Sequence, residues 1–166
     1  MQIETPQIVD YIALATKIKE WGRELGFQAV GIADINLHDA EERLLDWLAR
    51  GFHGEMDYMA KHGAKRTRPE ELIPGTLRVI SVRMDYYPPN VKDSWEVIED
   101  GSRAFISRYA LGRDYHKVLR NRLKKLAEKI RTEVGGCSYR VFTDSAPVME
   151  VELACLGSRK EVVPTR

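Results

Sequence analysis

The segment 77–86 constrains the fold more than any other part of the sequence. Its side chains alternate between two faces, for example with Val79 and Ser81 on one face and Ile80 on the other. This alternation and the β-branched residues within it are typical of a β-strand. We therefore expect a strand here, which the prolines at 88–89 end.

Three segments have the apolar spacing of amphipathic helices: residues 8–25, a segment that follows Asp39, and residues 115–134. Gly26 stands where the first helix needs a left-handed C-cap. Asp39 and Asp114 have the side chain that caps a helix N-terminus, so we expect the second and third helices to begin there. The buried face of the second helix is expected to consist of Leu44, Leu45, Trp47 and Leu48.

Three more segments, 27–33, 104–109 and 138–142, are further strand candidates, since each is short and contains alternating or apolar residues. Helices and strands then follow one another along the chain. This order predicts an α/β (α+β-like) fold, a single layered domain in which helices flank a mixed sheet.

The composition is typical of one globular domain. The chain has 166 residues, of which 43% are hydrophobic and 31% are charged. No apolar run approaches the roughly 20 residues that span a bilayer, and the first residues are acidic, unlike a targeting signal. We therefore expect a cytoplasmic protein with no membrane contact.

Metal binding finds little support in the sequence. The two cysteines, Cys137 and Cys155, are too few for a [4Fe–4S] cluster, which takes four thiolates. The four histidines are scattered and lack the spacing of a zinc site. We expect this chain to hold no metal ion or cluster through its own side chains.

Positive charge is concentrated in residues 101–131, where ten lysines and arginines face only Asp114 and Glu128. Such an excess indicates a surface for a polyanion, and the alternative is an ordinary solvated helix face. The candidate contact residues are Arg113, Lys117, Arg120, Arg122, Lys124 and Lys125.

Asp144 is the strongest candidate for chemistry. It follows the strand expected at 138–142 and precedes Pro147, which places it at a sheet edge where α/β folds bind ligands. A carboxyl that a bound ligand partly removes from water can act as a general acid near neutral pH. The alternative is that Asp144 makes an Asx-turn to the amides that follow it.

Several collinear segments match one known family. They are S-R-Y-A-L-G-R-D-Y-H at 107–116, F-T-D-S-A-P at 142–147, G-F-H-G-E-M-D at 51–57 and P-G-T-L-R-V-I-S-V-R-M at 74–84. Together they resemble the N-terminal half of epoxyqueuosine reductases, the cobalamin-dependent iron–sulfur enzymes that complete queuosine in transfer RNA.

The resemblance implies a catalytic role for Asp144, as the donor of a proton to the departing epoxide oxygen. It implies that cobalamin is bound base-off, with no protein histidine on the cobalt. The residues that it places around the cofactor are Arg66, Ser107, Arg108, Tyr115 and His116. Without the resemblance, Arg66 is equally well explained as part of a basic surface loop, and the other four as a strand end and the first turn of a helix.

The resemblance also implies partners. The basic helix would hold a queuosine-type transfer RNA through its backbone, presenting the wobble base. Electrons would come from the [4Fe–4S] clusters of the family's ferredoxin-like domain, whose ligands this chain lacks, or from another electron donor.

By resemblance, residues 1–150 form the cobalamin-binding and catalytic domain, and residues 151–166 are an atypical C-terminal tail that stands where the family continues toward its cluster domain. The expected function is that of the N-terminal part of an oxidoreductase, which reduces the epoxide of epoxyqueuosine in tRNA to queuosine and is incomplete or inactive alone. The alternatives are a stand-alone corrinoid-binding module and an RNA-binding remnant without reductase activity.

Overall fold

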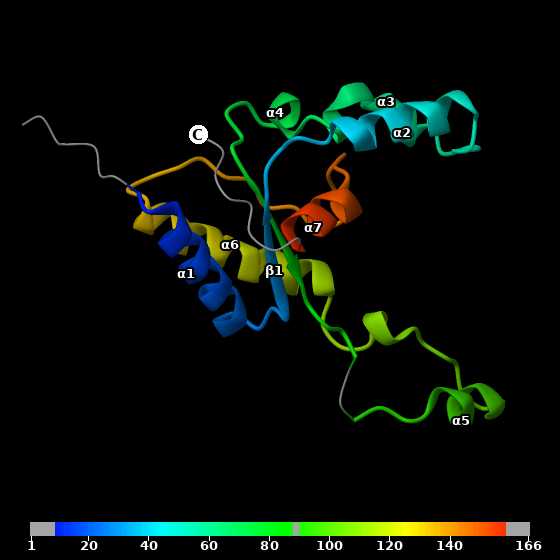
Figure 1. The fold of residues 1–166 in the computed structure, drawn as a ribbon. Helices are drawn as coiled ribbons and strands as arrows, with labels where there is room; N and C mark the ends of the chain where they lie inside the picture. Colours follow the sequence, from blue (N-terminus) through cyan, green and yellow to red (C-terminus); the bar gives the residue numbers. More distant parts are fainter. Residues whose placement is uncertain (1–8, 88–89, 159–166) are drawn as a thin grey trace, which may run out of the picture.

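The structure is a computed structural model that describes residues 9–87 and 90–158 (Figure 1). Three expectations fall outside these residues: the helix start at residue 8, the strand end at the 88–89 prolines, and the part of the atypical tail from residue 159 onward. No helix in the described ranges is long and apolar enough to cross a membrane.

A two-stranded antiparallel sheet lies at the centre of the molecule. Strand β1 (Ala29–Ala33) pairs with strand β2 (Val79–Arg83), with Gly31 opposite Ser81. Both strands lie within segments where the sequence predicts them, 27–33 and 77–86. The α/β class, with helices packed against a sheet, is confirmed.

The sheet is smaller than the sequence predicts, and it is antiparallel instead of mixed. The strand expected at 104–109 is wrong: Phe105 and Ile106 are exposed, and a short 3₁₀ helix, η2 (Arg108–Ala110), follows them. The strand expected at 138–142 is also wrong, because residues 138–140 are exposed and pair with no other strand of the described chain. Neither segment has a buried face, and burial is what stabilises a strand.

Helices cover both faces of the sheet. Helices α1 (Tyr11–Glu24) and α6 (Tyr115–Glu133) lie on one face, and α7 (Glu150–Ser158) lies on the other (Figure 1). Adjacent strand residues point to opposite faces, and accordingly Val30 packs against Gly22 of α1 whereas Gly31 packs against Gly157 of α7. Helix α7 begins at Glu150, and it therefore occupies the start of the segment, 151–166, that was expected to be an atypical tail.

The sequence predicts the C-cap of α1 at Gly26 and the N-cap of α6 at Asp114, and the structure confirms both. The N-cap of α1, Asp10, was not predicted. The Asp10 carboxylate accepts hydrogen bonds from the amides of Ile12 and Ala13, and Gly26 ends α1 with a φ of 82°. Asp114 caps α6 as predicted. Exposed ion pairs join the two helices, with Lys17 Nζ 2.6 Å from a Glu133 oxygen and Lys129 Nζ 2.7 Å from a Glu24 oxygen.

A group of short helices lies beyond one end of the sheet (Figure 1). It consists of α2 (His38–Ala49), α3 (Tyr58–Lys61), the 3₁₀ helix η1 (Gly63–Arg66) and α4 (Pro69–Leu72). The expected cap at Asp39 is wrong, because α2 already begins at His38 with Leu37 at the N-cap position. Leu37 is buried instead, in a core with Ala33, Ala40 and Leu153. Of the buried face expected for α2, Leu44 is buried but Leu45 is 54% exposed.

Glu41 ties α2 to the segment after η1. One of its carboxylate oxygens accepts from Thr67 Oγ1 at 2.6 Å and from Arg68 Nε at 3.0 Å, and the other accepts from Arg68 Nη2 at 2.7 Å. The hydrogen bonds from Arg68, and then the one from Thr67, lower the pKa of Glu41 to about 2. These hydrogen bonds from Thr67 and Arg68 fix the position of η1, which immediately precedes them, and therefore that of Arg66.

Residues 84–87 and 90–114 lie beyond the other end of the sheet (Figure 1). They contain the short helix α5 (Ser94–Glu99), which Asp93 caps, and then η2. Their aromatic residues Tyr86, Tyr87 and Trp95 are exposed.

We predict that Gly157→Ala destabilises the fold. Alanine in place of glycine within a helix usually adds roughly 1 kcal/mol of helix stability. Here the new Cβ would lie 2.9 Å from the Gly31 carbonyl carbon and from the Ile32 nitrogen, which are backbone atoms that cannot turn aside. We expect the free energy of unfolding in urea to fall by about 1–3 kcal/mol.

The matched control is Gly101→Ala, since a Cβ at Gly101 meets nothing within 4 Å. We expect no loss of stability there. A Gly157→Ala variant as stable as the wild type would mean that α7 does not approach β1 as closely as described.

Candidate functional site

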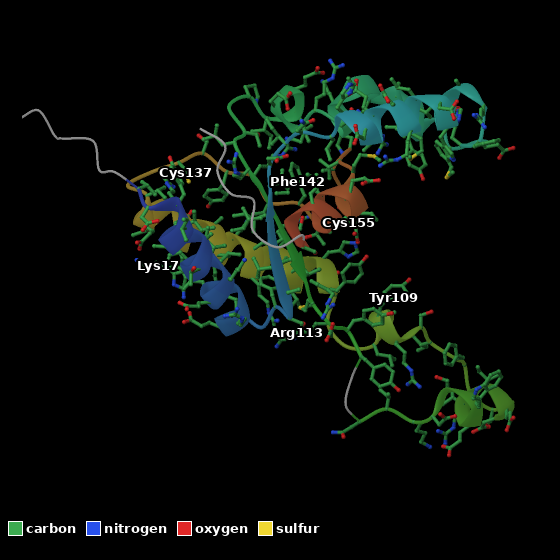
Figure 2. The ribbon with its side chains drawn as sticks, in the orientation of Figure 1. Lys17, Tyr109, Arg113, Cys137, Phe142 and Cys155 are labelled. Carbon is green, nitrogen blue, oxygen red and sulfur yellow. The ribbon has the colours of Figure 1, made fainter. Side chains whose placement is uncertain are left out.

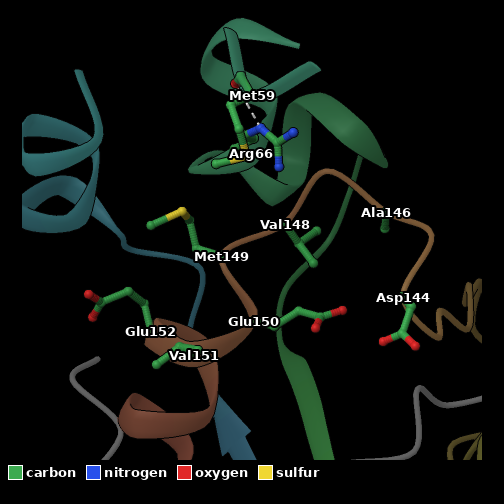
Figure 3. Close-up of a pocket in the computed structure, with 9 residues that line it drawn as sticks. All are labelled: Met59, Arg66, Asp144, Ala146, Val148, Met149, Glu150, Val151 and Glu152. Atoms are coloured by element: carbon green, nitrogen blue, oxygen red, sulfur yellow. Dashed lines mark hydrogen bonds between the residues drawn. The ribbon is translucent and has the colours of Figure 1, made fainter. Parts of the chain in front are cut away.

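An open cavity of about 450 Å³ lies between the α3–η1 segment and the chain that leads into α7 (Figure 3). Arg66 and Asp144, which are far apart in the sequence, both line it. Its apolar side chains come from Met59 of α3, from Ala146, Val148 and Met149 before α7, and from Val151 in α7. The lining residues are Met59, Arg66, Asp144, Ala146, Val148, Met149, Glu150, Val151 and Glu152.

Arg66 is held rigidly in this cavity wall. The residue is only 9% exposed, and its guanidinium donates from Nε to the Met59 carbonyl at 3.0 Å and from Nη2 to the Tyr58 carbonyl at 2.8 Å. Its own carbonyl accepts from the Met149 amide at 3.2 Å. Arg66 therefore connects α3 to the segment before α7, in addition to bringing a positive charge to the cavity.

Asp144 has an unusual backbone conformation. It is the one non-glycine residue with positive φ, at 55°, in the described part of the chain. Aspartate and asparagine enter this left-handed region more readily than most residues do. The conformation turns the chain after Thr143, so that the Asp144 carboxylate meets the start of α6.

Two side chains of the first turn of α6 meet the Asp144 carboxylate at one oxygen. Tyr115 Oη donates a hydrogen bond to Oδ2, and His116 Nε2 lies 3.5 Å from the same atom. The Tyr115 and His116 rings are stacked, with centroids 4.0 Å apart. The carboxylate is thus held by a side chain instead of by the amides that an Asx-turn would use.

The charges of this cluster shift two pKa values. The hydrogen bond to Asp144 raises the pKa of Tyr115 to about 12, because the carboxylate is stabilised by the neutral phenol and repels the phenolate. The hydrogen bond with His116 lowers the pKa of Asp114, whose Oδ1 lies 2.9 Å from His116 Nδ1.

Glu150 is a cavity residue that the sequence argument missed. Partial burial of its carboxyl, and then the negative charge of Asp144, raise its pKa. In the close-up the Glu150 side chain extends to the same side of the cavity as Asp144 (Figure 3). Glu152 differs, since it forms an ion pair with Arg43 at 2.7 Å. The only signal in the sequence was a second acidic residue shortly after Asp144.

Ser107 and Arg108 do not line this cavity. Arg108 Nη2 donates to the Lys92 carbonyl and to Ser94 Oγ, both at 2.7 Å, and thereby ties η2 to the start of α5. Ser107 is exposed just before η2. This region reaches the Asp144 cluster indirectly, because the Tyr109 ring meets the Tyr115 ring edge-on at 6.0 Å.

The basic residues of α6 divide into two groups. Arg122 faces inward, where Nη1 donates to the Gly26 carbonyl at 3.1 Å. The others are exposed. Lys129 pairs with Glu24 and Arg131 pairs with Glu128, whereas Lys117, Arg120, Lys124 and Lys125 form no ion pair with a carboxylate of residues 9–87 or 90–158. Of these, Lys117, Arg120 and Lys124 recur at helical spacing and share one face of α6. Arg113 lies just before the start of the helix (Figure 2). Lys125 lies beside that face.

Within the described ranges, no three histidine, cysteine or acidic residues gather as a metal site would require. Cys137 and Cys155 are free, exposed and in different parts of the molecule (Figure 2).

We predict that Tyr115 ionises only at strongly alkaline pH, and that Asp144→Asn lowers the pKa of Tyr115 toward its ordinary value. The bond to the neutral phenol contributes to stability below the ordinary pKa of 10, and the contribution is lost as the pH rises toward about 12. In an ultraviolet titration, Asp144→Asn should therefore show one more tyrosinate than the wild type at about pH 11. Adding Tyr115→Phe to both proteins should remove the difference, whereas superimposable curves for the two parents would contradict the contact.

Comparison with known proteins gives one consistent result. The family described as "Epoxyqueuosine reductase QueG, DUF1730" matches residues 66–145. The epoxyqueuosine reductase of Pseudomonas aeruginosa is 58% identical over 145 residues, which cover 87% of this chain and 40% of the relative. That of Vibrio cholerae is 57% identical over 146 residues, which cover 88% of this chain and 39% of the relative. No solved structure matches the chain.

The Escherichia coli epoxyqueuosine reductase is 55% identical over 146 residues, covering 88% of this chain and 38% of the relative. The chain thus spans about two fifths of the length of the curated relatives that it matches. The matched residues include Arg66 and Asp144 of the cavity. The chain therefore belongs to the epoxyqueuosine reductase family and corresponds to the N-terminal part of its longer members.

Proposed function

We propose that this chain is the cobalamin-binding and proton-donating part of an enzyme that reduces the epoxide of epoxyqueuosine in transfer RNA to queuosine. The observation that carries the proposal is the cavity, since Arg66 and Asp144 line it together. Family membership supplies the reaction, and the cavity supplies a place where a cofactor and an acid can meet.

The cavity has the chemistry that a large flat cofactor needs. Ala146, Val148 and Val151 give it an apolar wall, and Arg66 adds a rigid donor group. His116 Nε2 lies 3.5 Å from Asp144 Oδ2, and we propose that cobalamin binds base-off without a protein histidine on the cobalt. Cobalamin, when bound, supplies the reducing chemistry, and the protein positions the cofactor and manages the proton.

Asp144 is the residue that we propose as the acid. When the carbon–oxygen bond of the epoxide breaks, the oxygen that leaves takes up a proton, and the Asp144 carboxyl can give it. Tyr115 fixes the orientation of that carboxyl through the hydrogen bond to Oδ2. Tyr115 does not compete as a donor, since its pKa of about 12 keeps its proton in place near neutral pH.

The exposed face of α6 is the proposed contact for the transfer RNA. Lys117, Arg120 and Lys124 share this face, with Lys125 beside it and Arg113 just before the helix, whereas the inward position of Arg122 gives that residue a structural role. Contacts of this kind hold the phosphate backbone without reading its sequence. The proposed electron source is a cluster domain or a separate donor, so the chain is expected to be inactive without one.

Cobalamin binding gives the first test. We expect an absorption titration of the purified chain with cob(II)alamin to show a base-off shift that saturates near one equivalent. Val151→Trp should weaken binding at least tenfold, because Val151 is exposed at the cavity wall and a large ring there blocks the cavity without disturbing the core.

The control is Ile12→Trp, which replaces an equally exposed aliphatic residue on α1, on the opposite face of the sheet. It should bind cobalamin as the wild type does. A folded wild-type chain that gives no spectral shift would refute the cofactor assignment.

Turnover gives the second test. With cobalamin and a chemical reductant in place of the electron donor, Asp144→Asn should lower the rate of epoxide reduction by roughly 10²–10⁴-fold. Its affinity for the transfer RNA should change little, because Asp144 is not one of the basic residues that would contact the phosphate backbone. Lys117→Ala together with Lys124→Ala should weaken transfer RNA binding and reduce its salt dependence instead. Equal rates for Asp144→Asn and wild type would exclude Asp144 as the acid.

A further inference from the structure

His116 is fixed by one carboxylate oxygen at two points. Asp114 Oδ1 accepts from the His116 backbone amide at 3.0 Å and lies 2.9 Å from its ring Nδ1. A carboxylate can only accept, so Nδ1 carries the hydrogen of this bond. The helix cap therefore also sets the orientation of the ring and leaves Nε2 as the nitrogen that faces Asp144.

Asp144 Oδ2 thus has two neighbours, Tyr115 and His116, which differ in how readily they exchange a proton near neutral pH. Tyr115 donates to it but holds its own proton up to a pKa of about 12. His116 Nε2 lies 3.5 Å from it, and imidazole is the side chain that exchanges protons near neutral pH. The 3.5 Å separation exceeds a well-formed hydrogen bond, and such contacts commonly shorten when substrate is bound.

We propose that His116 returns a proton to Asp144 after each turnover, with Asp114 as the anchor that positions the ring. The inference rests on the proposed function, in which Asp144 gives its proton to the oxygen of the opened epoxide. The Asp144 carboxylate then takes the proton from Nε2 of the imidazolium. The neutral ring, which still donates from Nδ1 to Asp114, takes a new proton from water at Nε2.

The surroundings suit this exchange. The His116 side chain is 46% exposed, so water reaches the ring. The nearest charged and titratable groups are the N-cap Asp114, Lys117 of α6 and Asp144, with the Tyr115 ring stacked on the His116 ring. Two further groups lie one contact away: Tyr109 of η2 meets Tyr115, and Glu150 of α7 lies near Asp144. The carboxylates of Asp114 and Asp144 lie on its two sides, and Lys117 is the one cation among these groups.

Turnover separates this role from a structural one. In the proposed cycle Asp144 enters a turnover protonated, so His116→Gln should slow repeated turnovers more than the first turnover in a rapid-mix experiment with one equivalent of substrate. Later turnovers should be slower by roughly 10²-fold, and added imidazole should partly restore them. His38→Gln is the control, because His38 is an exposed histidine on α2, and both phases should stay unchanged there. Equal slowing of the first and later turnovers, or no slowing, would overturn the proposal.

A second measurement needs neither cofactor nor turnover. In the chain alone, carbon-13 NMR of aspartate carboxyls and nitrogen-15 NMR of histidine rings should show Asp144 and His116 titrating as one coupled unit, with both steps in each signal. His116→Gln should leave Asp144 with a single step, whereas His38→Gln should not.

The two experiments fail separately. A wild-type chain that shows coupled titration but no turnover with reductant would refute the proposed function of this chain and leave the proton contact supported. An Asp144 signal that His116→Gln does not change would overturn the proton contact itself, whatever the turnover.

Discussion

The close approach of β1 and α7 is the constraint on which the rest of the structure depends. Gly31 and Gly157 meet with no room for a side chain on either, so the helix lies directly on the backbone of the sheet. This contact fixes the segment that enters α7, and Met149 in that segment bonds to Arg66. A two-stranded sheet is too small to be stable alone, and here helices cover both of its faces.

The start of α6 shows how an ordinary structural device can also serve a site. Asp114 satisfies a free amide at the helix N-terminus, which is the normal role of an N-cap. The same oxygen orients His116, and the following turn presents Tyr115 to Asp144. Three neighbouring residues thus connect the start of a helix to a carboxylate on another segment.

Local pattern predicted the parts of this structure that depend on local physics. The Asp114 cap, the C-cap at Gly26 and the alternating strand after Leu77 are examples, because their signals lie within a few residues. The strands expected at 104–109 and 138–142 failed because alternation does not show whether a partner strand exists. Helix α7 was missed because residues 151–166 were assigned to an atypical tail where the sequence departs from the family, and the contact of Gly157 with Gly31 that supports this helix joins distant parts of the chain. The inward position of Arg122 likewise depends on a distant residue, Gly26.

The positive φ of Asp144 ties the acid to the shape of the chain. Few residues accept that conformation without strain, and asparagine and glycine are the two that do so while lacking an acidic group. The position therefore has a narrow set of tolerated replacements, all of which keep the turn and remove the carboxyl. Under the role that we propose for Asp144, one substitution here would remove the chemistry of a family member while its fold and cavity stay intact. An intact fold in a relative would then say little about activity unless this position is compared as well.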